Sequence, residues 1–135
     1  MENRKRILVA DDEAHITLAL RGGLSKHGYD IRVAGEAESA LEIFNAWSPD
    51  LVITDLSVPN MTDLELCRRL RETSKIPIII LSVKEDESVK IKALDAGADY
   101  YVTKPFGFGG LLARVRAVTT ISSRCHVSED RDRRW

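Results

Sequence analysis

The stretch Ile7-Leu8-Val9-Ala10-Asp11-Asp12 joins a short aliphatic run directly to two carboxylates. A run this short favours a buried strand, because a helix needs about ten residues or more. Comparable apolar runs recur along the chain and again end in polar residues, at positions 31–34, 51–54, 78–81 and 100–102. The sequence therefore predicts five strands, each followed by polar groups.

The segments between these runs have the periodicity of helices. Their apolar residues recur at the i, i+3, i+4 and i+7 spacing that places them on one helix face. Gly28 and Gly97 stand where helices are expected to end, and Pro49 and Pro77 precede strands. The strict alternation of strands and helices predicts a parallel, doubly wound α/β sheet with helices on both faces. The apolar helical positions are 16, 19, 20, 23 and 24, then 37, 40, 41 and 44, then 64, 67 and 70, then 91 and 94, and finally 111, 115 and 118.

The composition is that of one globular domain. The chain has 135 residues, of which 44% are hydrophobic and 30% are charged, and its formal net charge is −1. This balance gives no indication of binding to nucleic acid or to a membrane surface. No apolar run approaches the ~20 residues of a membrane span, and no signal-peptide core is found near the N-terminus. Two cysteines, Cys67 and Cys125, suit a reducing compartment, so we expect a cytoplasmic protein.

The periodic pattern lapses near residue 119. Residues 119–123 combine β-branched side chains with serines, which continue a helix poorly, and 128–135 is a run of mixed charge. We therefore expect a domain over residues 1–118 and a poorly ordered tail over 119–135. The alternative is that residues 119–135 begin a linker to a second domain.

Chemically distinctive residues stand at the carboxyl ends of the predicted strands. Asp11 and Asp12 follow the first strand, Asp55 follows the third, Ser82 the fourth and Lys104 the fifth. A doubly wound sheet places its ligand site at these ends of its strands. Three carboxylates brought together repel one another unless a cation joins them, and such hard oxygen ligands suit Mg²⁺. The sequence thus predicts a magnesium site at this edge.

The same edge suits phosphoryl chemistry. A metal ion, an ammonium and a hydroxyl around a carboxylate form a site for a tetrahedral anion, and an aspartate can attack phosphorus to give an acyl phosphate. Asp55 is the candidate nucleophile because it stands alone on the central strand. Each residue also has an ordinary structural explanation, since Asp11 or Asp12 can cap a helix and Asp55 can be a solvated strand end. The functional interpretation depends on the combination.

Three segments together resemble the receiver domain of two-component response regulators. They are residues 7–13 (ILVADDE), 50–59 (DLVITDLSVP) and 96–106 (AGADYYVTKPF), and the resemblance extends over about residues 5–118. It implies a flavodoxin-like sheet with strand order 2-1-3-4-5 and five helices.

The resemblance also implies a role for each acidic residue. Asp55 accepts a phosphoryl group from a phosphohistidine on a sensor histidine kinase. Mg²⁺ is bound directly by Asp12 and by Asp11 mainly through water, with Asp55 and the backbone carbonyl of Ser57 completing the protein ligands. A receiver of this kind assists its own phosphorylation and dephosphorylation but is not a turnover enzyme.

The remaining site residues belong to the switch. By the same resemblance, Ser82 and Lys104 contact the phosphoryl oxygens. Tyr101, three residues before the lysine, is the aromatic switch whose rotamer follows the Ser82 hydroxyl. The switching surface consists of the fourth helix, the fifth strand and the fifth helix.

Residues 104–106 (KPF) and 111–117 (LLARVRA) resemble the winged-helix transcription-factor class of this family. This class implies transcriptional control through a separate DNA-binding domain, with no nucleic acid or membrane contact by the receiver itself. It also implies a homodimer through charges on the switching surface, which Lys90, Asp95, Asp99 and Arg114 match. Gly110 and Tyr100 stand where acids are expected, and residues 120–121 (TI) replace a basic pair. Because surface ion pairs are each worth only ~0.2–1 kcal/mol, we expect a weak dimer.

Two other functions remain open at this point. An aspartyl-phosphate hydrolase also uses an aspartate at a strand end, although it needs a second acid two residues later, where this chain has Ser57. A phosphorylation-independent interaction module would keep the fold without the chemistry. Turnover of a small phosphate ester would identify the first, and loss of Mg²⁺ binding would favour the second.

Overall fold

The computed structural model describes residues 4–11, 13–55, 63–82, 87–103 and 106–124. All five predicted strands are confirmed to within one residue at either end. The strands are β1 (Arg6–Ala10), β2 (Asp30–Ala34), β3 (Leu51–Asp55), β4 (Ile78–Ser82) and β5 (Tyr100–Thr103). The helices that alternate with them are α1 (Ala14–Ser25), α2 (Ala37–Trp47), α3 (Asp63–Thr73), α4 (Glu87–Asp95) and α5 (Phe108–Arg124).

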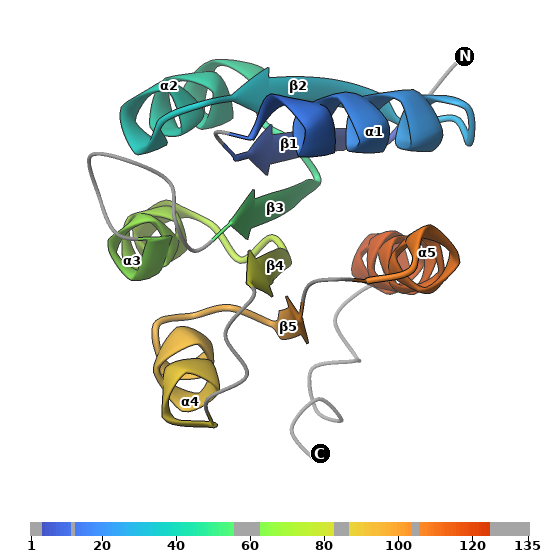
Figure 1. Cartoon of the computed structure of the whole chain (residues 1–135). Coiled ribbons are helices and arrows are strands. Elements are labelled where there is room, and N and C mark those ends of the chain that lie inside the picture. Colours follow the sequence, from blue (N-terminus) through green and yellow to red (C-terminus); the bar gives the residue numbers. More distant parts are fainter. Residues whose placement is uncertain (1–3, 12, 56–62, 83–86, 104–105, 125–135) are drawn as a thin grey trace.

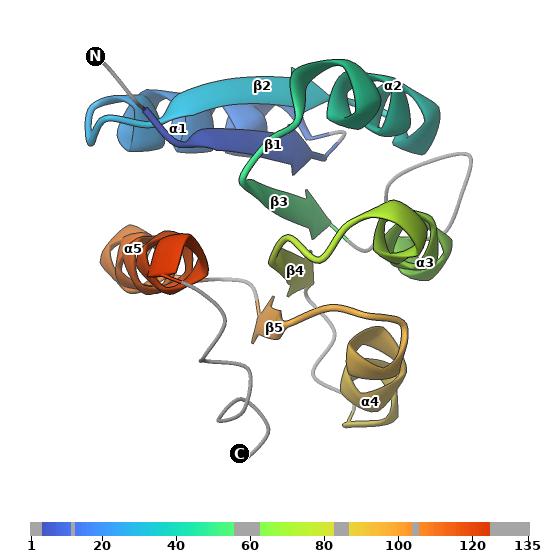
Figure 2. The same cartoon turned by 180° about the vertical axis from the view of Figure 1, so that it is seen from behind.

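The strands form one parallel sheet in the order β2-β1-β3-β4-β5, which confirms the predicted flavodoxin-like arrangement. Strand β3 lies at the centre and β2 and β5 lie at the edges (Figure 1). Helices α1 and α5 cover one face, and α2, α3 and α4 cover the other, as the view from behind also shows (Figure 2). The sheet is therefore doubly wound, as expected.

Each face of the sheet has its own hydrophobic core, because successive residues of a strand point to opposite sides. In β1, Leu8 and Ala10 pack toward α2, α3 and α4, whereas Ile7 and Val9 pack toward α1 and α5. Strands β3 and β4 are buried along their whole length, since helices cover both of their faces. This explains why their sequences are almost continuously apolar.

Two glycines end helices as predicted. Gly28 follows α1 with φ +92° and Gly97 follows α4 with φ +121°, both in the region that side chains disfavour. Gly97 has a second constraint, because a Cβ atom added there would lie 2.5 Å from Cγ of Arg71. No other residue type fits this position without displacing that side chain.

Two helices differ from the sequence expectation. Helix α5 continues past residue 118 to Arg124, and Thr119 is buried with its hydroxyl donating to the carbonyl of Val115 (2.8 Å). Burial and this bond offset the poor helix propensity of threonine. The predicted domain boundary at 118 stays a prediction, because residues 125–135 lie outside the described part. In α4, Ile91 and Leu94 are 53% and 45% exposed, whereas Ala93 is buried.

Candidate functional site

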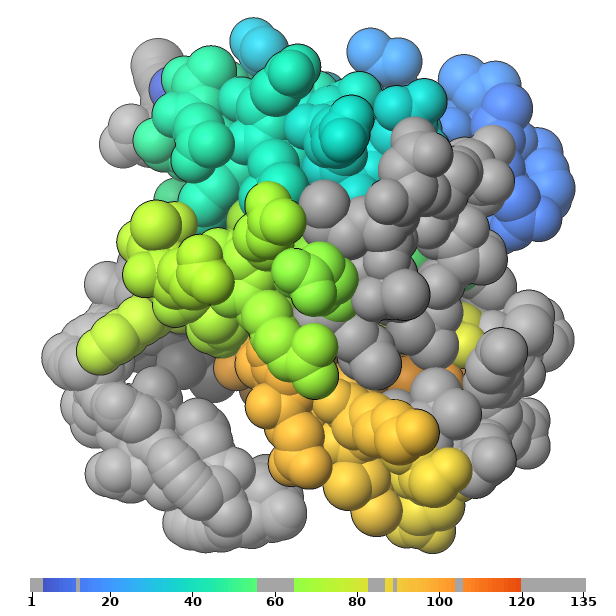
Figure 3. Space-filling model, turned by 90° about the vertical axis from the view of Figure 1, so that its left-hand side faces the viewer, coloured from blue at the N-terminus to red at the C-terminus, as the bar shows by residue number. Residues whose placement is uncertain are grey.

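Three predicted site residues lie side by side at the carboxyl ends of neighbouring strands. Ala10 pairs with Thr54 and Asp55 pairs with Leu81. Asp11, which follows β1, therefore lies at a closely matching level with Asp55 and Ser82, the last residues of β3 and β4. Their exposed fractions are only 2%, 3% and 2%. Figure 3 views the molecule from the side toward which β1, β2 and β3 point in Figure 1. The edge thus brings together two buried carboxylates and a buried hydroxyl.

Asp11 is fixed by both its backbone and its side chain. Its N–H donates to the carbonyl of Ala34 (3.0 Å), which ties the end of β1 to the end of β2. Its Oδ1 accepts the N–H of Glu13 (2.9 Å), while Oδ2 is buried. The N-cap residue of α1 is Glu13, without a side-chain cap bond. Asp11 therefore shapes the turn before α1 and is not itself the helix cap.

The chemistry of this donor set fits a hard divalent cation. Asp11 and Asp55 are carboxylates on adjacent strands, both buried, and burying like charges together is costly without a cation. The described residues alone contain no group of three or more potential acidic, histidine or cysteine ligands. Of the predicted ligands, Asp12 and Ser57 lie outside the described residues, as does Lys104.

Strand β5 carries two tyrosines that each lie beneath a cation from a different helix. The guanidinium of Arg114 in α5 lies 4.5 Å from the ring centroid of Tyr100. The ammonium of Lys90 in α4 lies 5.9 Å from the ring centroid of Tyr101, which packs against the core on the α2, α3 and α4 side. Both distances are within the range of a cation–π contact. Two charges that were expected to pair subunits thus have partners within the chain.

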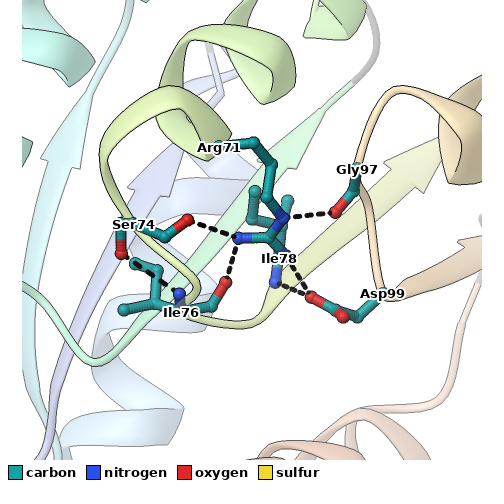
Figure 4. Close-up of polar contacts among 6 residues, drawn as sticks. All are labelled: Arg71, Ser74, Ile76, Ile78, Gly97 and Asp99. Atoms are coloured by element: carbon teal, nitrogen blue, oxygen red, sulfur yellow. Dashed lines mark hydrogen bonds and ion pairs between the residues drawn. The ribbon is translucent and has the colours of Figure 1, made fainter. Parts of the chain in front are cut away.

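Asp99, another residue of the expected dimer surface, is also held within the chain (Figure 4). Its Oδ2 lies 2.6 Å from Nη2 of Arg71 and accepts the N–H of Ile78 (2.9 Å). Arg71 Nε donates to the carbonyl of Gly97 (3.0 Å), and Nη1 donates to the carbonyls of Ile76 and Ser74 (2.5 and 3.4 Å). We call this the Arg71 network. Sequence patterns missed it, because Arg71 is one of several charged residues in α3 and two of its partners, Gly97 and Asp99, lie 26 and 28 residues away.

A comparison with models of known protein families identifies the family of this chain. The model of the response regulator receiver domain matches residues 7–116, most of the chain. The chain belongs to the response-regulator receiver family. It is therefore the receiver domain of a two-component response regulator, and the recognition made from its three motifs is confirmed.

Relatives of this receiver include transcriptional regulators. It is 46% identical over 111 residues to the transcriptional regulatory protein KdpE of Mycobacterium tuberculosis, covering 82% of this chain and 49% of the relative. It is 41% identical over 114 residues to the response regulator MprA of Mycolicibacterium vanbaalenii, covering 84% of this chain and 49% of the relative. The chain thus spans about half the length of the curated relatives it matches.

Solved receivers have the same fold. The BeF3-activated receiver domain of RstA from Klebsiella pneumoniae superposes with a TM-score of 0.82 at 30% identity, covering 85% of this chain and 98% of that one. The BeF3-activated DrrB receiver domain gives a TM-score of 0.82 at 29% identity, covering 88% of this chain and all of that one. No helix in the described part of this receiver is long and apolar enough to span a membrane.

Proposed function

We propose that Asp55 is the phosphoacceptor of this receiver and that a sensor histidine kinase supplies the phosphoryl group. The observation that carries the proposal is the burial of Asp55 at the end of the central strand, between Asp11 and Ser82 on the flanking strands. A carboxylate oxygen of Asp55 attacks phosphorus, an O–P bond forms, and the P–N bond to the donor histidine breaks. The histidine nitrogen keeps the electron pair and takes up a proton, so the product is an acyl phosphate.

Mg²⁺ is part of this proposal because the donor set suits it. Asp11, Asp12, Asp55 and the carbonyl of Ser57 would hold the ion, which when bound neutralises charge on the phosphoryl oxygens. The Ser82 hydroxyl donates to a phosphoryl oxygen, and the Lys104 ammonium balances the charge that remains. The carboxylate of Asp55 is consumed and restored once per signalling cycle, so this receiver is not a turnover enzyme.

The output of this site is a change in the α4–β5–α5 surface, with Tyr101 as its switch. The chain resembles the winged-helix transcription-factor class, and its relatives KdpE and MprA are a transcriptional regulatory protein and a response regulator by name. A DNA-binding domain beyond this receiver would therefore control transcription, in the cytoplasm. Within that class the sequence resembles the regulator of the high-affinity potassium-transport operon, and the KdpE relative is consistent with this. Phosphorylation would favour a weak homodimer through the same surface.

The deciding experiment measures intact mass after incubation with acetyl phosphate and Mg²⁺. The unchanged protein should gain one phosphoryl group, and Asp55→Asn should gain none, because the amide has no nucleophilic oxygen anion. Asp30→Asn is the matched control: Asp30 is an exposed carboxylate at the opposite end of a strand and should leave labelling unchanged. Labelling that persists in Asp55→Asn would identify another acceptor and overturn the proposal.

The same preparation tests the alternatives. Continuous turnover of a small phosphate ester would indicate a hydrolase. A protein that neither gains mass nor binds Mg²⁺ would be an interaction module, and the proposed chemistry would be wrong.

A further inference from the structure

A buried threonine directly precedes the candidate phosphoacceptor. Thr54 is 0% exposed and stands next to Asp55 in β3, the central strand. Its register partners are Ala10 in β1 and Ile80 in β4, and both belong to the core beneath α2, α3 and α4. The Thr54 side chain, like that of Val52 two residues earlier, therefore faces an apolar layer. A hydroxyl in such surroundings needs a hydrogen-bond partner.

The Thr54 hydroxyl bonds the main chain of the phosphoacceptor itself. Its Oγ1 donates to the carbonyl oxygen of Asp55 at 3.4 Å. This distance is long for a bond between a hydroxyl and an oxygen, so the bond is weak. Because neighbouring residues of a strand point to opposite faces, the hydroxyl lies on the other side of the sheet from the Asp55 side chain. Thr54 thus acts on Asp55 through the backbone.

The bond is placed where the pairing of β3 ends on one side. The register of β3 with β1 stops at the pair Ala10–Thr54, whereas the register with β4 continues to Asp55–Leu81. Asp55 is also the last residue of β3. The Thr54 hydroxyl therefore fixes the Asp55 carbonyl one residue beyond the last pair with β1.

We infer that Thr54 is a positioning residue for the phosphoacceptor: its buried hydroxyl holds the Asp55 backbone, and through it the carboxylate, in the orientation that attack on phosphorus needs. The inference rests on the proposed function, in which Asp55 is the nucleophile. Losing the bond widens the range of orientations of the carboxylate, and efficient attack needs a narrow range. A weak hydrogen bond corresponds to a change in rate of about twofold to fivefold.

The alternative is that Thr54 only fills the core, and two substitutions separate the parts of its side chain. Thr54→Val keeps the shape and removes the hydroxyl. It should slow labelling of Asp55 without lowering the free energy of unfolding, since valine suits an apolar core. Thr54→Ser keeps the hydroxyl and removes a methyl group. It should lower the free energy of unfolding, because a small cavity remains, and it should be labelled at the wild-type rate.

The experiment follows the intact mass of the full chain over time at a fixed concentration of acetyl phosphate with saturating Mg²⁺, and urea unfolding gives the stability of each variant. Labelling of Thr54→Val should be about twofold to fivefold slower than that of the wild type. Thr119→Val is the matched control and should be labelled at the wild-type rate, because Thr119 is also buried but its hydroxyl donates within α5, to the carbonyl of Val115 (2.8 Å).

The ¹³C NMR signal of the Asp55 backbone carbonyl reports the bond itself. We expect this signal to move in Thr54→Val and to keep its wild-type position in Thr54→Ser and in Thr119→Val. This measurement does not require phosphorylation, so it separates the bond from the proposed chemistry.

Labelling of Thr54→Val at the wild-type rate would overturn the inference. Labelling and stability that fall together in both Thr54 variants would also overturn it, because the role of Thr54 would then be structural only. The proposed function fails separately. If the wild type gains no phosphoryl group at Asp55 while the carbonyl signal moves in Thr54→Val, the bond stands, but the role of the site is wrong and the positioning role fails with it. If the wild type is labelled at Asp55 and Thr54→Val is labelled equally fast, only the inference about Thr54 is wrong.

Discussion

Arg71 and Asp99 form an ion pair with 2.6 Å between Nη2 and Oδ2, which joins the end of α3 to the residue that precedes β5. The same guanidinium donates to the carbonyls of Gly97 and Ile76, and the same carboxylate accepts the N–H of Ile78 at the start of β4. The pair therefore satisfies three backbone groups at once: two loop carbonyls and the N–H of the first residue of β4. It lies at the amino ends of β4 and β5, away from the candidate phosphoacceptor site.

Arg71→Gln should destabilise the fold. The variant leaves the Asp99 carboxylate and the carbonyls around it without their charged donor, so the free energy of unfolding should fall by about 1–3 kcal/mol. Urea denaturation followed by circular dichroism measures this. Arg69→Gln is the control, since Arg69 makes only an exposed i,i+4 pair with Glu65 (3.3 Å) and should change stability by less than about 0.5 kcal/mol. Equal stability of the two variants would contradict a structural role for the network.

Gly97→Ala should also lower the free energy of unfolding, but for a different reason. The backbone there has φ +121°, and an added Cβ would lie 2.5 Å from Cγ of Arg71, so we expect a loss of about 1–3 kcal/mol in unfolding free energy. Gly22→Ala provides the contrast. Gly22 lies inside α1, where a Cβ meets nothing within 4 Å, and alanine should add about 0.5–1 kcal/mol. Thermal or urea unfolding that ranks the two substitutions in the opposite order would refute this prediction.

Removing one buried carboxylate should reduce the gain in folding stability that Mg²⁺ provides. Asp11→Asn keeps an Oδ1 acceptor for the N–H of Glu13 but removes a negative charge next to Asp55. With EDTA present, the variant should be more stable than the wild type by about 1 kcal/mol, because one repulsion between like charges is lost. With Mg²⁺ present, the wild type should gain stability and the variant should gain much less. Identical Mg²⁺ dependence of the two unfolding curves would place the ion elsewhere.

Gly110→Glu should strengthen self-association. The position is exposed, near the start of α5, and has space for a side chain, so glutamate should also raise stability by about 1 kcal/mol through helix propensity. Its carboxylate then offers Lys90 of a second chain an ion pair. Gly110→Ala separates the two effects, since it improves the helix without the charge.

Sedimentation velocity with beryllofluoride and Mg²⁺ measures the outcome. We expect the wild type to be a monomer or weak dimer at micromolar concentration without phosphate and to dimerise only partly with beryllofluoride. Gly110→Ala should behave the same way, and Gly110→Glu should shift toward dimer. A tight wild-type dimer without beryllofluoride would show that apolar packing, for which Ile91 and Leu94 are exposed, outweighs the missing charges.

The arrangement of the sheet could be predicted because its signals are local. Each of the five strands begins or ends one residue beyond its apolar run. Asp55 and Ser82 are examples, because they are strand residues in the structure and were predicted to follow the strands. The placement of these residues at one edge then followed from parallel pairing alone. That reasoning needed no knowledge of side-chain contacts, so the common position of these residues could be predicted from the sequence.

The contacts that surround β5 could not be predicted in this way. Arg71 and Asp99 are 28 residues apart, and nothing in the spacing of charged residues on a polar helix face indicates which partner they choose. For residues 119–124, helix propensity indicated a poor continuation, whereas α5 extends to Arg124 in the structure. Propensity describes an isolated helix, but Thr119 is buried against the fold. Ile91 and Leu94 correctly indicated a helix, although both are exposed in the structure. Ala93 is buried there, and its small side chain gives a weaker sequence signal.

The neighbouring positions of Tyr100 and Tyr101 have a consequence for how such a protein can change over evolutionary time. Adjacent residues of a strand face opposite layers, so a substitution at 100 alters the environment of α5, and a substitution at 101 alters that of α4. A lineage can therefore change the residue that meets Arg114 while keeping the residue that meets Lys90. Paralogous regulators could thus diverge at the position facing α5 while the packing of position 101 against α4 is inherited intact.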